Sequence, residues 1–538
     1  MPEAAYHVEE FTPEERGTLE AYVTDLDGPA FALTNLPQVT CAALFARYSR
    51  SRKSLRRLLL DEFLNTAAPL ESSAGAPIAA AAVSRQAGRE RAADLFGRVL
   101  AEYGDDSVAQ LAGVHVACEQ VSQPLAKAIE WGRLGAYLEQ STRYIAYSDR
   151  PDGRYRYHRD PELMTSPHGD AYVRAMDGLF DAYSAMLDPL RDHLDRALPA
   201  ESDPAARRRA VRALALDVLR SLLPAGTVSN VGVFASPQAY EQMLLRLRAH
   251  PLPEARAYAA RLEAQLQLVI PEFLTRLGRP ERGGVWVDYL RETASDVRAG
   301  AEALLPEREW GPPGVTLVDW DRDGEDRILA AVLFAESHAS AERALAAVRP
   351  LSQERRAEIF AAAVGPRRNR RHRPGRGFEH CRYTFEVISD YGAFRDLQRH
   401  RMLTIQWQEL SPSLGYEIPP EVEHAGLASQ WRDAVRVAEE TYRGVARDLP
   451  QQAQYLVTLG HRLRYLVTVN AREAMHMIEL RTSPQGHPSY RRICQEMHRL
   501  VDEVAGHHHV AQAMRFLNSD DVHLPRYAAE AARAAPGD

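Results

Sequence analysis

Two stretches of the 538-residue chain follow the same order of sequence patterns, about 270 residues apart. Residues 113–120 alternate apolar and polar side chains, which predicts a half-buried strand, and residues 124–131 are compatible with a helix. The same order returns at residues 380–388 and 391–398. Because solenoid repeats are only about 20–50 residues long, this spacing predicts a duplicated and fused domain.

Each copy continues with helical periodicity, at residues 171–196 and 207–223 in the first and at 426–448 and 451–469 in the second. Residues 307–314 are rich in glycine and proline, which favours a junction, and residues 315–318 predict the opening strand of the second copy. We therefore predict an α+β fold of two tandem copies, each a mixed sheet packed with long helices. The predicted domains are 1–305 and 314–538.

Composition excludes several classes of protein. The chain has 66 Lys and Arg against 73 Asp and Glu, a net charge of −7, so no overall attraction to nucleic acid or anionic membrane is expected. No apolar run approaches the ~18 residues of a membrane span, and the N-terminus lacks the pattern of a secretory signal. The four cysteines form no CxxC pair, which disfavours a zinc ribbon or a disulfide framework. We expect a cytoplasmic protein.

Arg399, His400 and Arg401 are consecutive at the end of a predicted helix. Arginine forks bind phosphates and carboxylates in bidentate fashion, but such a tripeptide taken alone is more often an exposed surface segment. Further along the chain, Arg472 and His476 are four residues apart and share one helix face. Taken alone, that helix is equally an ordinary amphipathic helix with a polar side.

Taken together, these segments resemble the flavin-dependent thymidylate synthase family. The resemblance rests on residues 378–380 with 383–385, on the Arg399–Arg401 tripeptide, and on residues 468–472 with 480–481. It covers about residues 315–518, and more weakly about residues 38–274. It implies an FAD enzyme, reduced by NADPH, that transfers a one-carbon unit from methylenetetrahydrofolate to C5 of dUMP, giving dTMP without a catalytic cysteine. Family sites form between subunits of a homotetramer, so two of these chains would form a homodimer that acts as a pseudo-tetramer.

The second copy departs from the family at the positions that the resemblance assigns to nucleotide binding. Nine residues separate Arg401 from Ser411, a longer spacing than the family's, and Ser413 stands where the family has an arginine. Gln454 aligns with a further family arginine. The resemblance therefore implies that the second copy has lost much of a phosphate clamp.

The first copy departs in the opposite way. Trp131 and Gly132 replace the first arginine and the histidine of the tripeptide. Ser141 and Arg143 keep the family's serine–arginine ending, and Arg220 aligns with its helix arginine. No asparagine of the first copy matches Asn470 of the second, and either Arg246 or Arg248 aligns with the family's leucine–arginine pair.

Because the two losses are complementary, we predict one composite site built from both copies. The resemblance implies that His372, Arg399, His400, Arg401, Asn470, Arg472 and His476 bind FAD. It implies that Glu139, Ser141, Arg143, Arg220 and Arg481 bind the nucleotide, with Arg401 and Ser411 catalytic and no metal. Chance retention of these residues is the alternative.

Two other functions stay open at this point. The lengthened 401–411 segment and Gln454 motivate a flavoenzyme of the same scaffold acting on another pyrimidine or a specialised metabolite. Residues 365–377 carry six arginines, which form a solvated loop, an anion-facing lid or an RNA contact and motivate a non-enzymatic nucleotide- or nucleic-acid-binding protein. Residues 507–509 are three adjacent histidines, which on one helix point in different directions and therefore disfavour a metal site.

Overall fold

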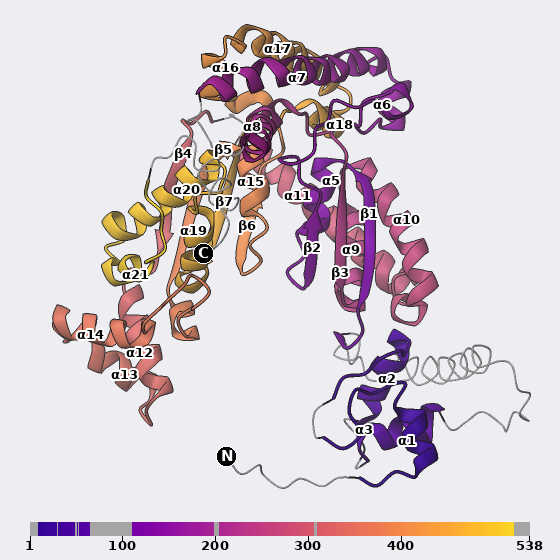
Figure 1. Cartoon of the computed structure of the whole chain (residues 1–538), viewed down its shortest axis with the longest axis vertical. Helices are drawn as coiled ribbons and strands as arrows, with labels where there is room; N and C mark the ends of the chain where they lie inside the picture. The colour runs from indigo at the N-terminus through magenta and orange to yellow at the C-terminus, as the bar shows by residue number, and fades with distance from the viewer. Residues whose placement is uncertain are drawn as a thin grey trace, which may run out of the picture. The chain divides into compact units, whose positions relative to one another are not determined.

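A computed structural model describes residues 9–28, 31–48, 51, 53–64, 110–197, 204–305 and 309–520 (Figure 1). The chain divides into two compact units. Unit 1 comprises Met1–Cys118, Leu134–Leu138 and Val231–Pro306, and unit 2 comprises Glu119–Arg133, Glu139–Asn230 and Glu307–Asp538. Unit 2 therefore takes segments from both sequence copies. The domain division at 305–314 stays a prediction, and residues 306–308 of that region lie outside the described residues.

Each sequence copy forms a sheet with the same strand order. The first sheet is β1-β3-β2 and the second is β4-β5-β7-β6, so β5-β7-β6 repeats the order of the first sheet and β4 is an added edge strand. The strands are β1 (Val114–Val121), β2 (Gly135–Glu139), β3 (Ser229–Ala235), β4 (Gly314–Trp320), β5 (Arg382–Asp390), β6 (Leu403–Trp407) and β7 (Arg462–Asn470). The α+β class is confirmed, although the sheets are antiparallel rather than mixed.

Helices pack beside both sheets (Figure 1). Those of unit 1 are α1 (Pro13–Leu19), α2 (Gln38–Tyr48), α3 (Leu55–Leu58), α9 (Pro237–Ala249), α10 (Pro253–Val269) and α11 (Val285–Leu304). Those of unit 2 are α5 (Gln123–Glu130), α6 (Pro161–Thr165), α7 (Gly169–Ala197), α8 (Pro204–Leu219), α12 (Gly324–Ala335), α13 (Ala341–Val348), α14 (Gln353–Val364), α15 (Tyr391–Leu397), α16 (Pro420–His424), α17 (Ala428–Val445), α18 (Pro450–Ala453), α19 (Ala471–Arg481), α20 (Pro488–Arg499) and α21 (His508–Ala513). None of these helices combines the length and the apolar character needed to cross a bilayer.

The helix predicted at residues 451–469 is wrong. Only its first residues are helical, in α18 and a following 3-10 turn, and β7 then covers Arg462–Asn470. Leu463, Tyr465, Val467 and Val469 are buried in alternation with more exposed neighbours, the period-two pattern of a strand. The predicted helices at 171–196, 391–398 and 426–448 are confirmed as α7, α15 and α17.

A short two-fold ladder joins the copies inside unit 2. It pairs residues 221–226 with residues 455–460, which hold equivalent positions in the two copies. The bonds run from Ala225 N–H to the Val457 carbonyl (2.7 Å), from Leu459 N–H to the Leu223 carbonyl (2.9 Å), from Gly226 N–H to the Tyr455 carbonyl (2.8 Å) and from Gly460 N–H to the Ser221 carbonyl (2.7 Å). Each bond has a counterpart at the equivalent position, as in an isologous dimer interface. The copies therefore meet in one chain as two subunits would.

Close backbone approach favours glycine at one position of this ladder. A Cβ on Gly460 would lie 2.9 Å from the Ser221 carbonyl oxygen. Above the ladder, α7 of the first copy packs against α17 of the second (Figure 1). Both helices carry the buried apolar stripe of an amphipathic helix, including Phe180 on α7 and Trp431 on α17. This packing fixes the region where side chains of both copies meet.

Candidate functional site

A buried carboxylate on α15, Asp396, lies among three arginines. Arg220 Nη1, from the first copy, is 3.4 Å from Asp396 Oδ2, while Arg481 Nη1 and Arg399 Nη1, from the second copy, are 3.7 and 3.9 Å from Oδ1. Burial alone would raise the pKa of Asp396, but these arginines outweigh it and hold that pKa well below its usual range. Asp396 is therefore ionised and holds arginines of both copies together.

A second buried carboxylate, Glu139, ends β2 of the first copy. It accepts hydrogen bonds from Arg395 Nη2 (2.6 Å), Arg399 Nη2 (2.8 Å) and Lys127 Nζ (3.0 Å). Lys127 on α5 and Arg395 on α15 hold equivalent positions in the two copies, and both donate to Glu139. Burial opposes its ionisation, yet Arg395 and Lys127 keep the pKa of Glu139 below its usual range.

Arg143 also bridges the copies. Its guanidinium forms a bidentate pair with Asp217 of α8, with Nε–Oδ1 and Nη2–Oδ2 distances of 2.6 and 2.8 Å. It also donates to the Tyr490 hydroxyl (3.1 Å) and to the Gln485 carbonyl (3.2 Å), both in the second copy. The side chain is thus fixed in place by both copies before any ligand binds.

These residues, which we call the arginine cluster, combine cations of both copies with shared carboxylates. Its cations are Lys127, Arg143, Arg220, Arg395, Arg399 and Arg481, and the carboxylates paired with them are Glu130, Glu139, Asp217 and Asp396. A fifth carboxylate, Glu473, is connected to Arg481 through His400. In addition, Arg220 Nη2 is buried and donates to no acceptor among the described residues. Because a buried donor without an acceptor is costly, the cluster is suited to bind a dianion such as a phosphate monoester.

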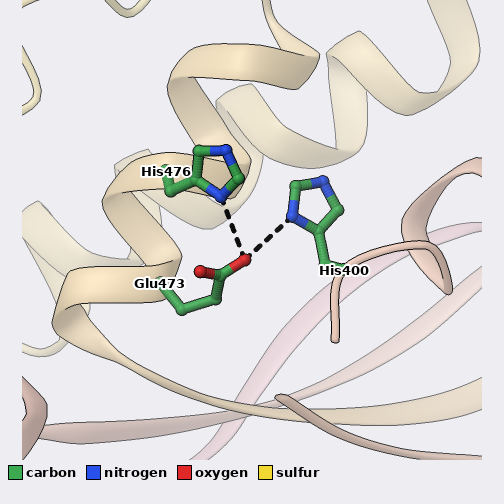
Figure 2. A group of neighbouring side chains, drawn as sticks. All are labelled: His400, Glu473 and His476. Carbon is green, nitrogen blue, oxygen red and sulfur yellow. Dashed lines mark hydrogen bonds and ion pairs between the residues drawn. The ribbon is translucent and has the colours of Figure 1, made fainter. Parts of the chain in front are cut away.

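Beside the cluster, two histidines share one carboxylate oxygen (Figure 2). His400 Nδ1 and His476 Nδ1 lie 3.0 and 3.1 Å from Glu473 Oε1. Burial raises the pKa of Glu473, but the hydrogen bonds from both imidazoles bring it down to about 2. Burial lowers the pKa of His400 to about 4, so this imidazole is neutral at pH 7.

The three ligand atoms of this group lie within 4.8 Å of one another, which is close enough for a metal ion. However, Arg481 Nε–H donates to His400 Nε2 at 3.0 Å. A neutral imidazole that binds a metal through Nδ1 carries its proton on Nε2, where it would face that donor. The arrangement therefore favours a hydrogen-bonded group that orients Arg481, and it disfavours a metal centre.

The neutrality of buried His400 predicts acid sensitivity. The unfolded imidazole has an ordinary pKa of 6.5 and the folded one about 4, so between these values the unfolded chain binds more protons. We expect stability to fall as the pH is lowered from 6.5 toward 4. Urea unfolding midpoints at pH 7 and pH 5 should show a smaller pH difference in His400→Gln than in the wild type, and an unchanged difference would contradict this assignment.

Asn470 is the N-cap of α19, where its side chain accepts from Glu473 N–H at 2.9 Å. This cap orients the helix that carries Glu473 and Arg481. We expect Asn470→Ala to cost about 1 kcal/mol of stability and Asn470→Asp to cost little, because aspartate also caps. Urea unfolding tests the difference, and equal losses in the two variants would show that the cap contributes nothing.

The remaining predicted residues make their contacts elsewhere. His372 lies in the 365–377 loop and contacts Arg368 and Asn369. The Ser411 hydroxyl bonds to Ser413, and Arg401 is exposed with no hydrogen bond or ion pair to the described part of the chain. The structure does not bring these three into the arginine cluster, and their roles stay predictions.

Three further predicted residues have local structural contacts. Ser141 accepts from Arg143 N–H (3.2 Å) and so shapes the turn that presents Arg143. Arg472 donates to the Pro374 carbonyl (2.9 Å) and pairs with Glu379. Arg248, one of the two arginines left open by the alignment, pairs with Glu263 inside unit 1.

Sequence reasoning named Glu139 as a site residue but missed the other residues that organise the cluster, Asp217, Asp396, Lys127 and Arg395. Asp217 precedes Arg220 by three residues, and Asp396 precedes Arg399 by three, a spacing that brings two side chains together on a predicted helix, although α8 ends at Leu219 and α15 at Leu397. That signal was available in the sequence. No local signal indicates that Lys127 and Arg395 converge on Glu139, because that contact depends on the packing of the two copies.

Comparisons with known proteins bear on this geometry. The sequence profile of the family described as "Thymidylate synthase complementing protein" matches residues 64–272 and again residues 316–506. The chain belongs to this family. The double match confirms the tandem duplication expected from the sequence repeat and seen in the two sheets.

Two related proteins match over most of the length of this family member. A "UPF0159 protein" of Chlamydia muridarum is 36% identical over 531 residues, covering 98% of this chain and 99% of the relative. A "UPF0159 protein" of Thermoplasma acidophilum is 31% identical over 475 residues, covering 82% and 92%. The crystal structure of the UMP/dUMP methylase PolB from Streptomyces cacaoi bound with 5-Br dUMP matches 38% of this chain and 96% of that chain, at 17% identity and a TM-score of 0.30.

Proposed function

We propose that this protein is a flavin-dependent thymidylate synthase, a methyltransferase-class enzyme that transfers a one-carbon unit to C5 of dUMP. The observation that carries the proposal is the arginine cluster, in which a chain of this family gathers arginines of both copies, and in which the buried Arg220 Nη2 has no acceptor among the described residues. A nucleotide monophosphate supplies the matching dianion. A second composite site in the chain would need the family's arginines and histidine at the positions of Gln454, Trp131 and Gly132. Because those residues are replaced, we propose one nucleotide site per chain.

In this proposal Arg143, Arg220 and Arg481 hold the phosphate, and the buried Arg220 Nη2 donates to one of its oxygens. Glu139, predicted to bind substrate, instead positions Arg395 and Arg399, since both of its oxygens are already engaged by cations. Negative charge develops on the pyrimidine when its C5 becomes nucleophilic toward the one-carbon unit, and the neighbouring guanidinium groups stabilise that charge. Their positions are set in advance by Asp396 and Asp217, so little reorganisation is required.

FAD binding is supported by the chemistry of the donor set at residues 399–401. Arg401 is exposed and pairs with no carboxylate of the described residues, and the Arg399 side chain is 39% exposed, so both are accessible to the phosphates of a dinucleotide. We propose that these arginines, with His400, His476, Asn470 and Arg472, hold the cofactor. When bound, FAD supplies the reducing equivalents of the reaction, with NADPH as reductant and methylenetetrahydrofolate as one-carbon donor.

The second candidate is the same chemistry on another pyrimidine nucleotide. Gln454 Oε1 accepts from Leu410 N–H at 3.1 Å and thus has a structural contact where the family has an arginine. The nucleic-acid alternative rests on Arg368, Arg371 and Arg373, whose side chains are exposed on the 365–377 loop. The net charge of −7 gives that alternative no wider support.

One experiment separates these functions. The purified protein is reconstituted with FAD, and its flavin absorbance, dUMP binding by calorimetry and methyl transfer from labelled methylenetetrahydrofolate are measured. We expect bound flavin, one dUMP per chain and labelled dTMP. Arg399→Ala should lose flavin, whereas Arg436→Ala, at an exposed ion pair on α17, should retain it. Flavin binding with transfer only to another pyrimidine would favour the second candidate, and a protein that binds no FAD would contradict both enzyme functions.

A further inference from the structure

Unit 1 contains an open pocket of about 520 Å³ beside the start of α11. All of its lining residues belong to unit 1, and none of them is a member of the arginine cluster. Its charged lining residues are Arg248, Arg256, Arg279, Asp288 and Arg291. Four guanidinium groups therefore surround this pocket, which we call the arginine pocket, together with one carboxylate.

Backbone carbonyl groups hold two of these arginines in place. Arg256 Nη1 donates to the His250 and Pro251 carbonyls at 2.8 and 2.6 Å. Arg291 Nη2 donates to the Arg248 carbonyl at 2.7 Å. A carbonyl oxygen is uncharged, so it fixes a guanidinium without neutralising it. Because a guanidinium has five N–H donors, and these contacts use one nitrogen of each, both side chains keep donors for a ligand.

A glycine shapes the segment that carries Arg279. Gly283 is buried, and a Cβ at this position would overlap the Leu277 carbonyl oxygen. The Gly283 N–H donates to the Arg276 carbonyl at 3.1 Å. This close turn leads directly into α11 and brings Arg279 to the same pocket as Arg291 of that helix.

Carboxylates neutralise the arginine pocket only in part. Arg248 pairs with Glu263, and Arg291 Nη1 lies 4.0 Å from Asp288 Oδ1. Two exposed arginines of the lining pair with no carboxylate in the described part of the chain, namely Arg256 and Arg279. Four arginines thus stand against two carboxylates. Since like charges repel, this arrangement favours a bound anion with at least two negative charges.

We propose that the arginine pocket binds a small organic molecule through a diphosphate group. Guanidinium forks match phosphate oxygens in bidentate geometry, and a diphosphate offers oxygens to several forks at once. A volume of about 520 Å³ lies within the ~300–1,000 Å³ of small-molecule sites, so an organic group fits beside the phosphates. The inference goes beyond the proposed function, which assigns no flavin or dUMP contact to these residues.

The test titrates the full-length protein by calorimetry with inorganic pyrophosphate and with ADP, which carries a diphosphate on an organic group. Excess FAD and dUMP are present at constant ionic strength, so that the sites of the proposed function are filled. Arg279→Gln removes a cation that has no partner to lose, and Asp288→Asn removes the carboxylate that lines the pocket. Matched controls with the same changes of net charge are Arg436→Gln and Asp433→Asn, at an exposed pair on α17.

We expect Arg279→Gln to weaken the binding of both probes about fivefold and Asp288→Asn to strengthen it about twofold. Both α17 controls should bind like the wild type, and ADP should bind at least as tightly as pyrophosphate. A wild type that binds neither probe, or pocket variants that match their controls, would overturn the arginine pocket. Tighter binding of pyrophosphate than of ADP would overturn the organic ligand.

This result is independent of the proposed function. Because each pocket variant is compared with its own α17 control, the comparison holds even if the protein takes up no FAD or dUMP. Failure of the proposed function appears as absent flavin or dUMP binding, whereas failure of the arginine pocket appears only in the titrations with pyrophosphate and ADP.

Discussion

Glu139→Gln is expected to lower the free energy of unfolding of unit 2 by about 3–5 kcal/mol, the usual cost of leaving a buried charge uncompensated. Glutamine is nearly the same size as glutamate but cannot neutralise Lys127 and Arg395, whose side chains are only 2% and 4% exposed. Urea unfolding followed by tryptophan fluorescence measures the loss. The midpoint of the unfolding transition assigned to unit 2 should shift to a lower urea concentration.

A matched control is Glu440→Gln, which removes the partner of Arg436 in an exposed pair on α17. Exposed pairs contribute about 0–1 kcal/mol, so this variant should unfold like the wild type. A further variant, Glu139→Leu combined with Arg395→Met, should recover part of the lost stability, because apolar side chains of similar size replace the buried pair. If Glu139→Gln loses no more stability than the control, Glu139 does not hold the copies together.

Arg220→Met is expected to weaken dUMP binding by about 100-fold, the effect of removing one charged partner of a buried ion pair. Arg220 is a first-copy residue whose Nη2 has no acceptor in the described protein, and methionine retains much of its apolar volume. Calorimetric titration of the FAD-bound protein with dUMP measures the change. Arg436→Met should bind dUMP like the wild type, and an unchanged affinity in Arg220→Met would contradict the phosphate clamp.

Much of the fold follows from local sequence patterns. The alternation at residues 380–388 predicts β5, and the long amphipathic stretches predict α7 and α17, because burial on one face dictates each period. The prediction failed at β7, where helical periodicity was predicted as far as residue 469. Its β-branched and aromatic inward residues favour the strand that forms.

The candidate site was predictable in part. The complementary losses in the two copies predicted that Arg143 and Arg220 would lie near Arg399 and Arg481, and the structure places all four in one cluster within unit 2. The role of each residue stays a proposal. Asp217 and Asp396 have an i, i+3 signal in the sequence, whereas the convergence of Lys127 and Arg395 on Glu139 and the two-fold ladder depend on long-range packing, for which the sequence carries no periodic signal.

The most direct test of the composite site is a double-mutant cycle on dUMP binding with Arg220→Met from the first copy and Arg481→Met from the second. The account predicts that each variant weakens binding and that the double variant departs from the sum by about 1 kcal/mol or more, since both side chains would contact one phosphate. Strictly additive effects, within about 0.5 kcal/mol, or a silent Arg220→Met variant, would show that the two copies do not share one nucleotide site.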